Sequence, residues 1–175
     1  MAGFIDNKVV VPWTDTHTGV HEGRVYDQQY KISGLARNGV FDFMMITGTR
    51  YPNVSTFQIT SGGGNIEVIL YEDSVTSNDG TQILEAVDRN RNKASTPHAF
   101  FYQGATYTDI GTSIWEVWLP PSTSGTGEGI TNLITSGADQ WILKPNTKYT
   151  YRITNLGGGK IDVVVDTAWL ETDTI

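Results

Sequence analysis

Apolar and polar residues alternate with a period of two in several stretches of the chain, and this pattern limits the possible folds more than any other sequence feature. In NIEVILYE, the apolar residues Ile66, Val68 and Leu70 fall on one face of an extended strand. The same alternation runs through TKYTYRIT (147–154) and KIDVVVDTAW (160–169). Such strands are typical of a sheet that buries one face and exposes the other.

Turn signals divide the chain into many short segments. Stretches rich in Gly, Pro, Asn and Asp occur at 50–53, 61–64, 78–80, 144–147 and 155–159, and the last is predicted to be a hairpin loop. Further strands are expected at 39–48 and 113–119, the latter covered on both faces, and at 9–13, 24–32, 54–60, 82–87, 98–103 and 139–144. The sequence therefore predicts an all-β fold, a jelly-roll-like two-sheet β-sandwich of about ten short antiparallel strands.

The length of 175 residues favours a single domain with a core of its own. Residues 23–175 are predicted to form this β-sandwich domain. A flexible loop is expected at 120–139, because PPSTSGTGEGITNLITSGAD is rich in Gly, Ser and Thr. Residues 1–22 are expected to be an N-terminal arm or a first strand. No stretch resembles a signal peptide, and no apolar run is long enough for a membrane helix.

The charge of the chain limits its partners. A formal net charge of −7 argues against binding to phosphate backbones, so no nucleic-acid partner is expected. The absence of cysteine excludes disulfide bonds and thiolate metal ligands. One stretch, DRNRNK, departs from the acidic pattern and carries Arg89, Arg91 and Lys93. A solvated turn is the simpler interpretation of this stretch, and a contact with an acidic protein partner is the alternative.

The stretch THTGVHEGR places His17 and His21 four residues apart, beside two carboxylates. In a helix this spacing would put both imidazoles on one face, where they could share a zinc ion. Gly19 and the β-branched residues around it disfavour a helix. In a strand the two histidines would lie too far apart for one metal. The segment is therefore predicted to be a polar connection between strands, with no metal or other cofactor.

The sequence contains no recognisable catalytic motif. It lacks the Gly-x-Ser-x-Gly elbow of hydrolases, the glycine-rich phosphate loops and the acidic spacing of a calcium loop. His98 is expected to be a half-buried structural residue at the start of an aromatic strand. Paired carboxylates from distant strands stay open as an alternative, since a glycoside hydrolase could assemble them in three dimensions. The chain is therefore predicted not to be an enzyme.

Three stretches resemble a known family of virion proteins. They are WILKPNTKYTYRITNLGGGKIDVVVDTAWLE (141–171), GNIEVILYEDSVTSNDGTQI with DRNRNKASTP (64–83 and 88–97), and HEGRVYDQQYKISGLARNGVFDFMMITG (21–48). The chain is similar in these parts to the head decoration, or cementing, proteins of tailed bacteriophages. The resemblance implies a jelly-roll domain that sits as an oligomer on the outer capsid surface and locks neighbouring major capsid subunits together. It implies no catalytic residues.

This resemblance leads to a set of expectations about partners and contacts. The partner is expected to be the major capsid protein, with self-association as a homodimer or homotrimer and no membrane partner. The protein would be made in the host cytoplasm and located on the virion. Candidate contact residues are Phe4, Val10 and Trp13 in the arm, Arg89, Arg91 and Lys93 in the basic turn, and Glu128 in the 120–139 loop.

Two other functions stay open from the sequence. One is a tail or fibre component of a phage virion. The other is a carbohydrate-binding β-sandwich, in which some of the five tryptophans and eight tyrosines would stack on sugar rings. Trp118 and Trp141 are the residues to test for that role.

Overall fold

The computed structural model describes residues 15–61, 65–83, 86–121 and 141–173. Over these residues the chain forms one helix, α1 (Asp15–Glu22), and thirteen strands. The strands are β1 (Val25–Leu35), β2 (Val40–Ile46), β3 (Tyr51–Ser61), β4 (Ile66–Glu72), β5 (Val75–Asn78), β6 (Thr81–Gln82), β7 (Val87–Asp88), β8 (Phe100–Gln103), β9 (Thr106–Asp109), β10 (Thr112–Leu119), β11 (Trp141–Ile142), β12 (Lys148–Asn155) and β13 (Ile161–Thr172). The helix is too short to cross a membrane.

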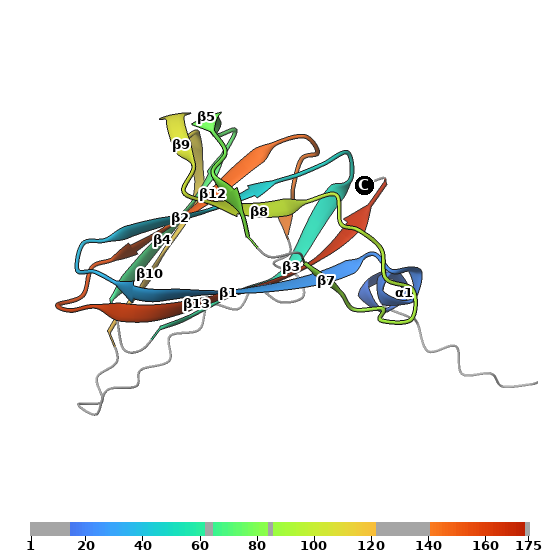
Figure 1. Ribbon diagram of the computed structural model, residues 1–175, viewed down its shortest axis with the longest axis horizontal. Helices are drawn as coiled ribbons and strands as arrows, with labels where there is room; N and C mark the ends of the chain where they lie inside the picture. The colour runs from blue at the N-terminus through green and yellow to red at the C-terminus, as the bar shows by residue number, and fades with distance from the viewer. Residues whose placement is uncertain (1–14, 62–64, 84–85, 122–140, 174–175) are drawn as a thin grey trace, which may run out of the picture.

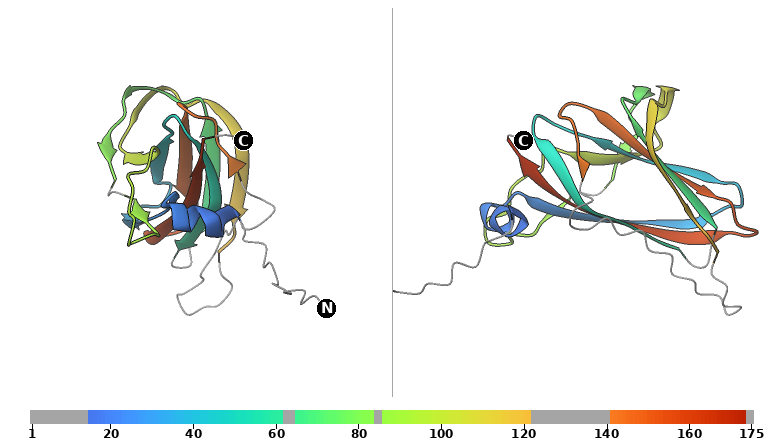
Figure 2. Two further views of the ribbon diagram at one scale, coloured as in Figure 1. Left: turned by 90° about the vertical axis from the view of Figure 1, so that its right-hand side faces the viewer. Right: turned by 180° about the vertical axis from the view of Figure 1, so that it is seen from behind.

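Two antiparallel sheets pack face to face, so the prediction of an all-β sandwich is confirmed. The first, sheet A, has the strand order β11-β3-β13-β1-β7, and the second, sheet B, has the order β10-β4-β12-β2-β8-β6. Figure 1 shows the two sheets with α1 at one end. A separate pair, β5 and β9, projects beyond the sandwich. The end-on and rear views show the same arrangement (Figure 2).

The core lies between the sheets and is built from the alternating residues. Ile66, Val68 and Leu70 are buried as predicted, and the odd-numbered residues of β12 and β13 are buried with them. Aromatic rings carry much of the contact across the core. Phe57 of sheet A stacks on Tyr151 of sheet B at a centroid distance of 4.2 Å. Each such buried side chain stabilises the fold by about 1.5–3 kcal/mol relative to its exposed state.

The chain crosses between the sheets at several connections, and this corrects two predictions. Residues 155–159 are not a hairpin loop, because β12 lies in sheet B and β13 in sheet A. The buried Asn155 amide holds this crossing by donating to the carbonyl oxygens of Leu35, Ala36 and Gly159. The single strand predicted at 82–87 is also wrong, since β6 belongs to sheet B and β7 to sheet A.

Strand β10 is an edge strand, whereas the sequence predicted that 113–119 would be covered on both faces. Trp115 and Val117 pack partly against the core, but the Trp118 side chain on the opposite face is 57% exposed. β10 pairs with β4 on one side and ends the strand order of sheet B among the described residues. Apolar residues on both faces of this strand therefore do not reflect burial on both sides.

Helix α1 occupies the segment that was predicted to be a non-helical connection. Gly19 does not prevent the helix; it lets the helix approach the outer face of sheet A. A Cβ at Gly19 would lie 2.4 Å from Leu170 Cδ1 and 3.1 Å from Val25 Cγ2. The helix ends at Gly23, which has a φ of +69°. The N–H of Gly23 donates to the Val20 carbonyl, and the N–H of Arg24 donates to the Gly19 carbonyl, the hydrogen bonds of a Schellman motif.

Replacing Gly23 by alanine should lower the free energy of unfolding by about 1–3 kcal/mol. The backbone conformation is strained for any other residue, and the new Cβ would lie 2.6 Å from the Lys93 carbonyl oxygen. Gly34→Ala is the matched control, because Gly34 has a φ of +64° but no atom within 4 Å of its Cβ position. Urea unfolding measures both variants. An equal loss in the two variants would contradict the close contact at Gly23.

A network of polar side chains joins β4 to the segment between β11 and β12. Glu72 accepts a hydrogen bond from Lys144 Nζ at 2.7 Å and from the Tyr149 hydroxyl at 2.8 Å. The hydrogen bond from Lys144 is the main reason why the pKa of Glu72 lies below its ordinary value of 4.5. Burial raises the pKa of Tyr149, so its hydroxyl stays protonated and can donate.

The stability of the fold should fall in acid for this reason. A carboxyl group whose pKa is lower in the folded protein than in the unfolded protein stabilises the fold at pH values above the unfolded pKa. This contribution is lost as the pH falls through the folded pKa. The urea midpoint is expected to stay level from neutral pH down to about pH 5 and to decrease below that. Glu72→Gln should reduce the slope of the urea midpoint against pH below about pH 5. A slope equal to that of the unmodified protein would show that Glu72 does not contribute.

Candidate functional site

The structure places the basic turn beside α1 at one end of the sandwich. The basic loop, defined here as residues 88–99, lies against α1 and the start of β1. Asn90 Nδ2 donates to the His21 carbonyl at 3.0 Å, and the Arg89 N–H donates to the Val25 carbonyl at 2.9 Å. These contacts join segments about 65 to 70 residues apart in the sequence, so the basic turn and the base of the predicted arm form one surface.

Asp88 organises the first half of the basic loop from inside the protein. Asp88 is only 2% exposed, and its two carboxylate oxygens accept hydrogen bonds from the N–H groups of Asn90 at 2.8 Å and Ser95 at 2.7 Å. Asn90 then accepts the N–H groups of Asn92 and Lys93 through its side-chain oxygen. Aspartate and asparagine commonly close turns in this way, because their side chains replace a backbone acceptor.

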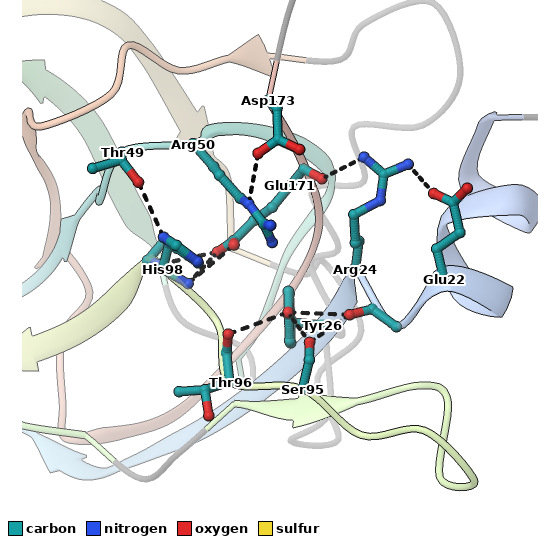
Figure 3. Close-up of polar contacts among 12 residues, drawn as sticks. Glu22, Arg24, Tyr26, Thr49, Arg50, Ser95, Thr96, His98, Glu171 and Asp173 are labelled. Carbon is teal, nitrogen blue, oxygen red and sulfur yellow. Dashed lines mark hydrogen bonds and ion pairs between the residues drawn. The ribbon is translucent and has the colours of Figure 1, made fainter.

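Glu171 holds the second half of the loop. It is fully buried on β13, and its carboxylate accepts the N–H groups of His98 at 2.8 Å and Ala99 at 2.9 Å. Trp169 Nε1 donates to the same carboxylate at 3.2 Å. Figure 3 shows the Glu171 side chain reaching from β13 to His98. No lysine or arginine side chain of the described residues forms an ion pair with Glu171, so N–H donors alone stabilise this buried carboxylate.

Tyr26 joins the loop to the core. Its ring packs on Trp169 at a centroid distance of 5.6 Å, and its hydroxyl lies 2.5 Å from Ser95 Oγ. The Ser95 hydroxyl donates in turn to the Gly23 carbonyl at the end of α1. Burial raises the pKa of Tyr26, so the phenol stays neutral near pH 7. The loop is therefore held at its start, middle and end by buried groups.

The three basic residues predicted to make contacts have different surroundings. Arg89 forms two hydrogen bonds to the Asp27 carboxylate, at 2.6 and 2.8 Å, and this pairing raises the pKa of Arg89. Its charge is therefore largely compensated within the protein. Arg91 and Lys93 are exposed, and neither forms an ion pair with any residue of the described chain. Arg91 and Lys93 are thus exposed cations whose charges no ion pair within the described residues compensates.

Ser95 and His98, the hydroxyl and imidazole of this end, are bonded to other partners rather than to each other. Ser95 is bonded to Tyr26 and Gly23, and the ring of His98 contacts Thr49 Oγ1 at 3.2 Å, so these two residues do not form a nucleophile and base pair. His98 is exposed, which corrects the prediction of a half-buried residue, and its backbone N–H is the group that holds the loop. In the described ranges, no group of three or more His, Asp and Glu side chains could hold a metal ion.

The other predicted contact residues lie outside the described part of the chain. These are Phe4, Val10 and Trp13 of the arm and Glu128 of the 120–139 loop, of which only Pro120 and Pro121 are described. Asp88, Asn90 and Glu171 were not singled out from the sequence. The Asp and Asn residues of DRNRNK are turn formers and were a usable signal. Glu171 lies two residues after Trp169, at the next buried position of β13. It can be recognised as an inward-facing carboxylate only if the strand is known to continue to residue 172.

Comparison with known proteins leaves this site to be interpreted from its geometry. No family model matches the chain, and no curated protein matches it either.

Replacing Glu171 by glutamine should lower the free energy of unfolding by about 2–4 kcal/mol. The amide would turn one acceptor into a donor that faces the N–H groups of His98 and Ala99. Glu67→Gln, at a partly exposed position on β4, is the control for the loss of one carboxylate. Hydrogen exchange should also become faster in residues 88–99. Equal unfolding energies in the two variants, with unchanged exchange in the loop, would show that Glu171 does not hold the loop.

Proposed function

We propose that this protein is a structural virion protein that binds the outer surface of a phage capsid and stabilises contacts between major capsid subunits. The preorganised basic loop next to α1 is the observation that supports this proposal most. The buried Asp88 and Glu171 accept four of its backbone N–H groups. Its exposed cations Arg91 and Lys93, which form no ion pair within the described residues, point to a protein partner of opposite charge. On this proposal the protein acts by binding alone, with no cofactor and no nucleic-acid partner.

Rigidity of the loop favours such a role. A loop that is already ordered loses less conformational entropy when it binds than a loop that must fold on its partner. Asp88 and Glu171 order the loop in the free protein. The predicted contact residues Phe4, Val10 and Trp13 precede α1 in the sequence. The arm and the loop would then contact one partner together.

Repetition would make weak contacts effective on a capsid. A homodimer or homotrimer presents two or three copies of the α1 end, and linked contacts sum through a high effective concentration. The protein would be made in the host cytoplasm and would add to the virion surface during assembly. A tail or fibre location stays an alternative, because the same surface could bind another virion protein.

The double variant Arg91→Glu/Lys93→Glu should bind capsids at least about tenfold more weakly, because the two charges facing the partner are reversed. The test is co-sedimentation with capsids assembled from the major capsid protein of the same virus, together with the temperature at which those capsids disrupt. Arg37→Glu/Lys160→Glu is the matched control. It makes the same charge change at exposed positions near the turns at the other end of the sandwich.

Three results would separate the possibilities. Binding lost in the first variant and kept in the second supports the α1 end as the contact surface. Equal losses would mean that net charge alone controls binding. Unmodified protein that neither sediments with the capsids nor raises their disruption temperature would rule out the decoration function.

A further inference from the structure

The edge of sheet B at β10 is open in the described part of the chain. β10 pairs with β4 on one side, and no other described strand pairs with its second side. From Trp115 to Leu119 the register with β4 is regular, and this stretch contains neither Lys nor Pro. Lysine and proline commonly protect edge strands, because the unpaired backbone groups of an edge can pair with another chain. β10 is therefore a candidate for strand addition.

The hydrogen-bond pattern of the sheet fixes which backbone groups of β10 are open. The Leu156 N–H donates to the Asn65 carbonyl, so the odd-numbered residues of β4 direct their backbone groups toward β12. The even-numbered residues of β4 face the odd-numbered residues of 115–119 in β10. Glu116 and Trp118 lie between them and therefore direct their N–H and C=O groups away from β4.

The same two residues place their side chains on the outer face of sheet B. Trp118 lies opposite Glu67, and Glu116 lies opposite Ile69. Glu67 and Ile69 alternate with the buried residues of β4, so all four side chains face outward. Trp118 is more than half exposed, and its Nε1 donates to Asn65 Oδ1, which fixes the indole ring beside the edge.

The carboxylates beside Trp118 lack a cationic partner within the described chain. Neither Glu67 nor Glu116 forms an ion pair with a described residue. Arg152 of β12 lies in the same cross-strand row as Glu116, but it donates to both carboxylate oxygens of Asp42. The sequence from 94 to 143 contains no Lys or Arg. The outer face at this edge is therefore complementary to a positively charged partner.

We propose that the open edge of β10 binds an extended segment of a basic protein partner by strand addition. In the added strand, the side chains opposite Glu116 and Trp118 are Lys or Arg. One pairs with the carboxylate and the other contacts the indole face. The residue between them faces inward beside the partly buried Val117 and is apolar. The site shares no residue with α1 or the basic loop, so it does not depend on the capsid proposal.

Other occupants fit this edge less well. Basic residues alternate in this chain at Arg89, Arg91 and Lys93, but asparagines separate them, and Asp88 holds that loop in a turn. A second copy would have to break these bonds to present an extended strand. A neutral sugar would leave both carboxylates without a counter-charge. Trp141, the other tryptophan considered for sugar stacking, packs partly against the core.

The experiment is an NMR titration of the isotope-labelled full chain with a short capped peptide in which Lys and Val alternate. The resonances of residues 115–119 should shift. Hydrogen exchange at the amides of Glu116 and Trp118 should slow by at least about tenfold at saturation, because these amides become paired. A peptide with Glu in place of Lys is the control for charge and should not bind. A Lys peptide methylated on alternate backbone nitrogens is the control for strand pairing and should also not bind.

Variants of the chain test the same contacts from the other side. Glu116→Lys should weaken binding of the Lys peptide by at least about tenfold, because it reverses the charge facing the partner. Asp166→Lys, at a partly exposed position on the outer face of sheet A, makes the same charge change and should leave binding unchanged. Glu116→Gln, at the same exposed position, adds no charge and should weaken binding severalfold, which protects the test against a folding defect. Arg91→Glu/Lys93→Glu should bind the peptide normally, which separates this proposal from the capsid contact.

Several results would overturn the proposal. These are unshifted resonances at 115–119, equal binding of the Glu peptide or the methylated peptide, and full binding by Glu116→Lys. Slow exchange at Glu116 and Trp118 in the free chain would show that the edge is already paired, with a second copy if dilution removes the protection and within the chain if it does not. Shifts caused by neutral sugars and not by the peptide would assign the edge to sugar binding.

Discussion

The buried carboxylate of Glu171 is the interaction on which the arrangement of the α1 end depends. It comes from β13 of sheet A and accepts N–H groups from the residues that lead into β8 of sheet B. A single carboxyl group thus connects the two layers and fixes the end of a loop with little regular structure. Burying such a polar group is costly unless hydrogen bonds replace its water, and here the replacing donors are the Trp169 indole and loop N–H groups. The loop N–H groups therefore stabilise the buried carboxyl group, and the carboxyl group in turn fixes the loop.

Asp88 repeats the same arrangement at the other end of the loop, and this explains how an irregular segment can present charges in a fixed geometry. Backbone donors that would otherwise need water are satisfied inside the protein, and the long side chains of Arg91 and Lys93 remain outside. Elsewhere in the sandwich, polar side chains are oriented by partners in a related way. The Tyr30 hydroxyl donates to Gln103 Oε1, and Arg152 donates to the Asp42 carboxylate.

Much of the fold could be predicted from the sequence, because an alternation with a period of two residues shows directly which face of a strand is buried. The faces of β4, β12 and β13 follow the alternation. The pattern does not state to which sheet a strand belongs, so β12 and β13 were paired wrongly although both of their buried faces were right. α1 was missed for a different reason. Gly19 lowers helix propensity locally, but the contact with Leu170 that requires a glycine forms only in the folded protein.

The candidate site also contains residues that the sequence reveals and residues that only the structure reveals. The exposed Arg91 and Lys93 could be found because a cluster of charges is visible in the sequence alone. The pairing of Arg89 could not be found in this way, because its partner Asp27 lies 62 residues away in the sequence. The role of Glu171 depends on a similarly distant contact, with His98. Residues whose role depends on a remote partner become recognisable only when the topology is known.

The pairing of β1 with β13 has a consequence for how the protein is made. Val25 lies opposite Leu170, so the centre of sheet A joins the two extremes of the described sandwich. Contacts this distant in sequence give the fold a high contact order, which is associated with slow folding. During synthesis most of β1 has no partner strand until residues 161–172 have left the ribosome, because β7, its other neighbour, pairs with only two of its residues. The nascent chain therefore depends on protection from aggregation for almost the whole of its translation.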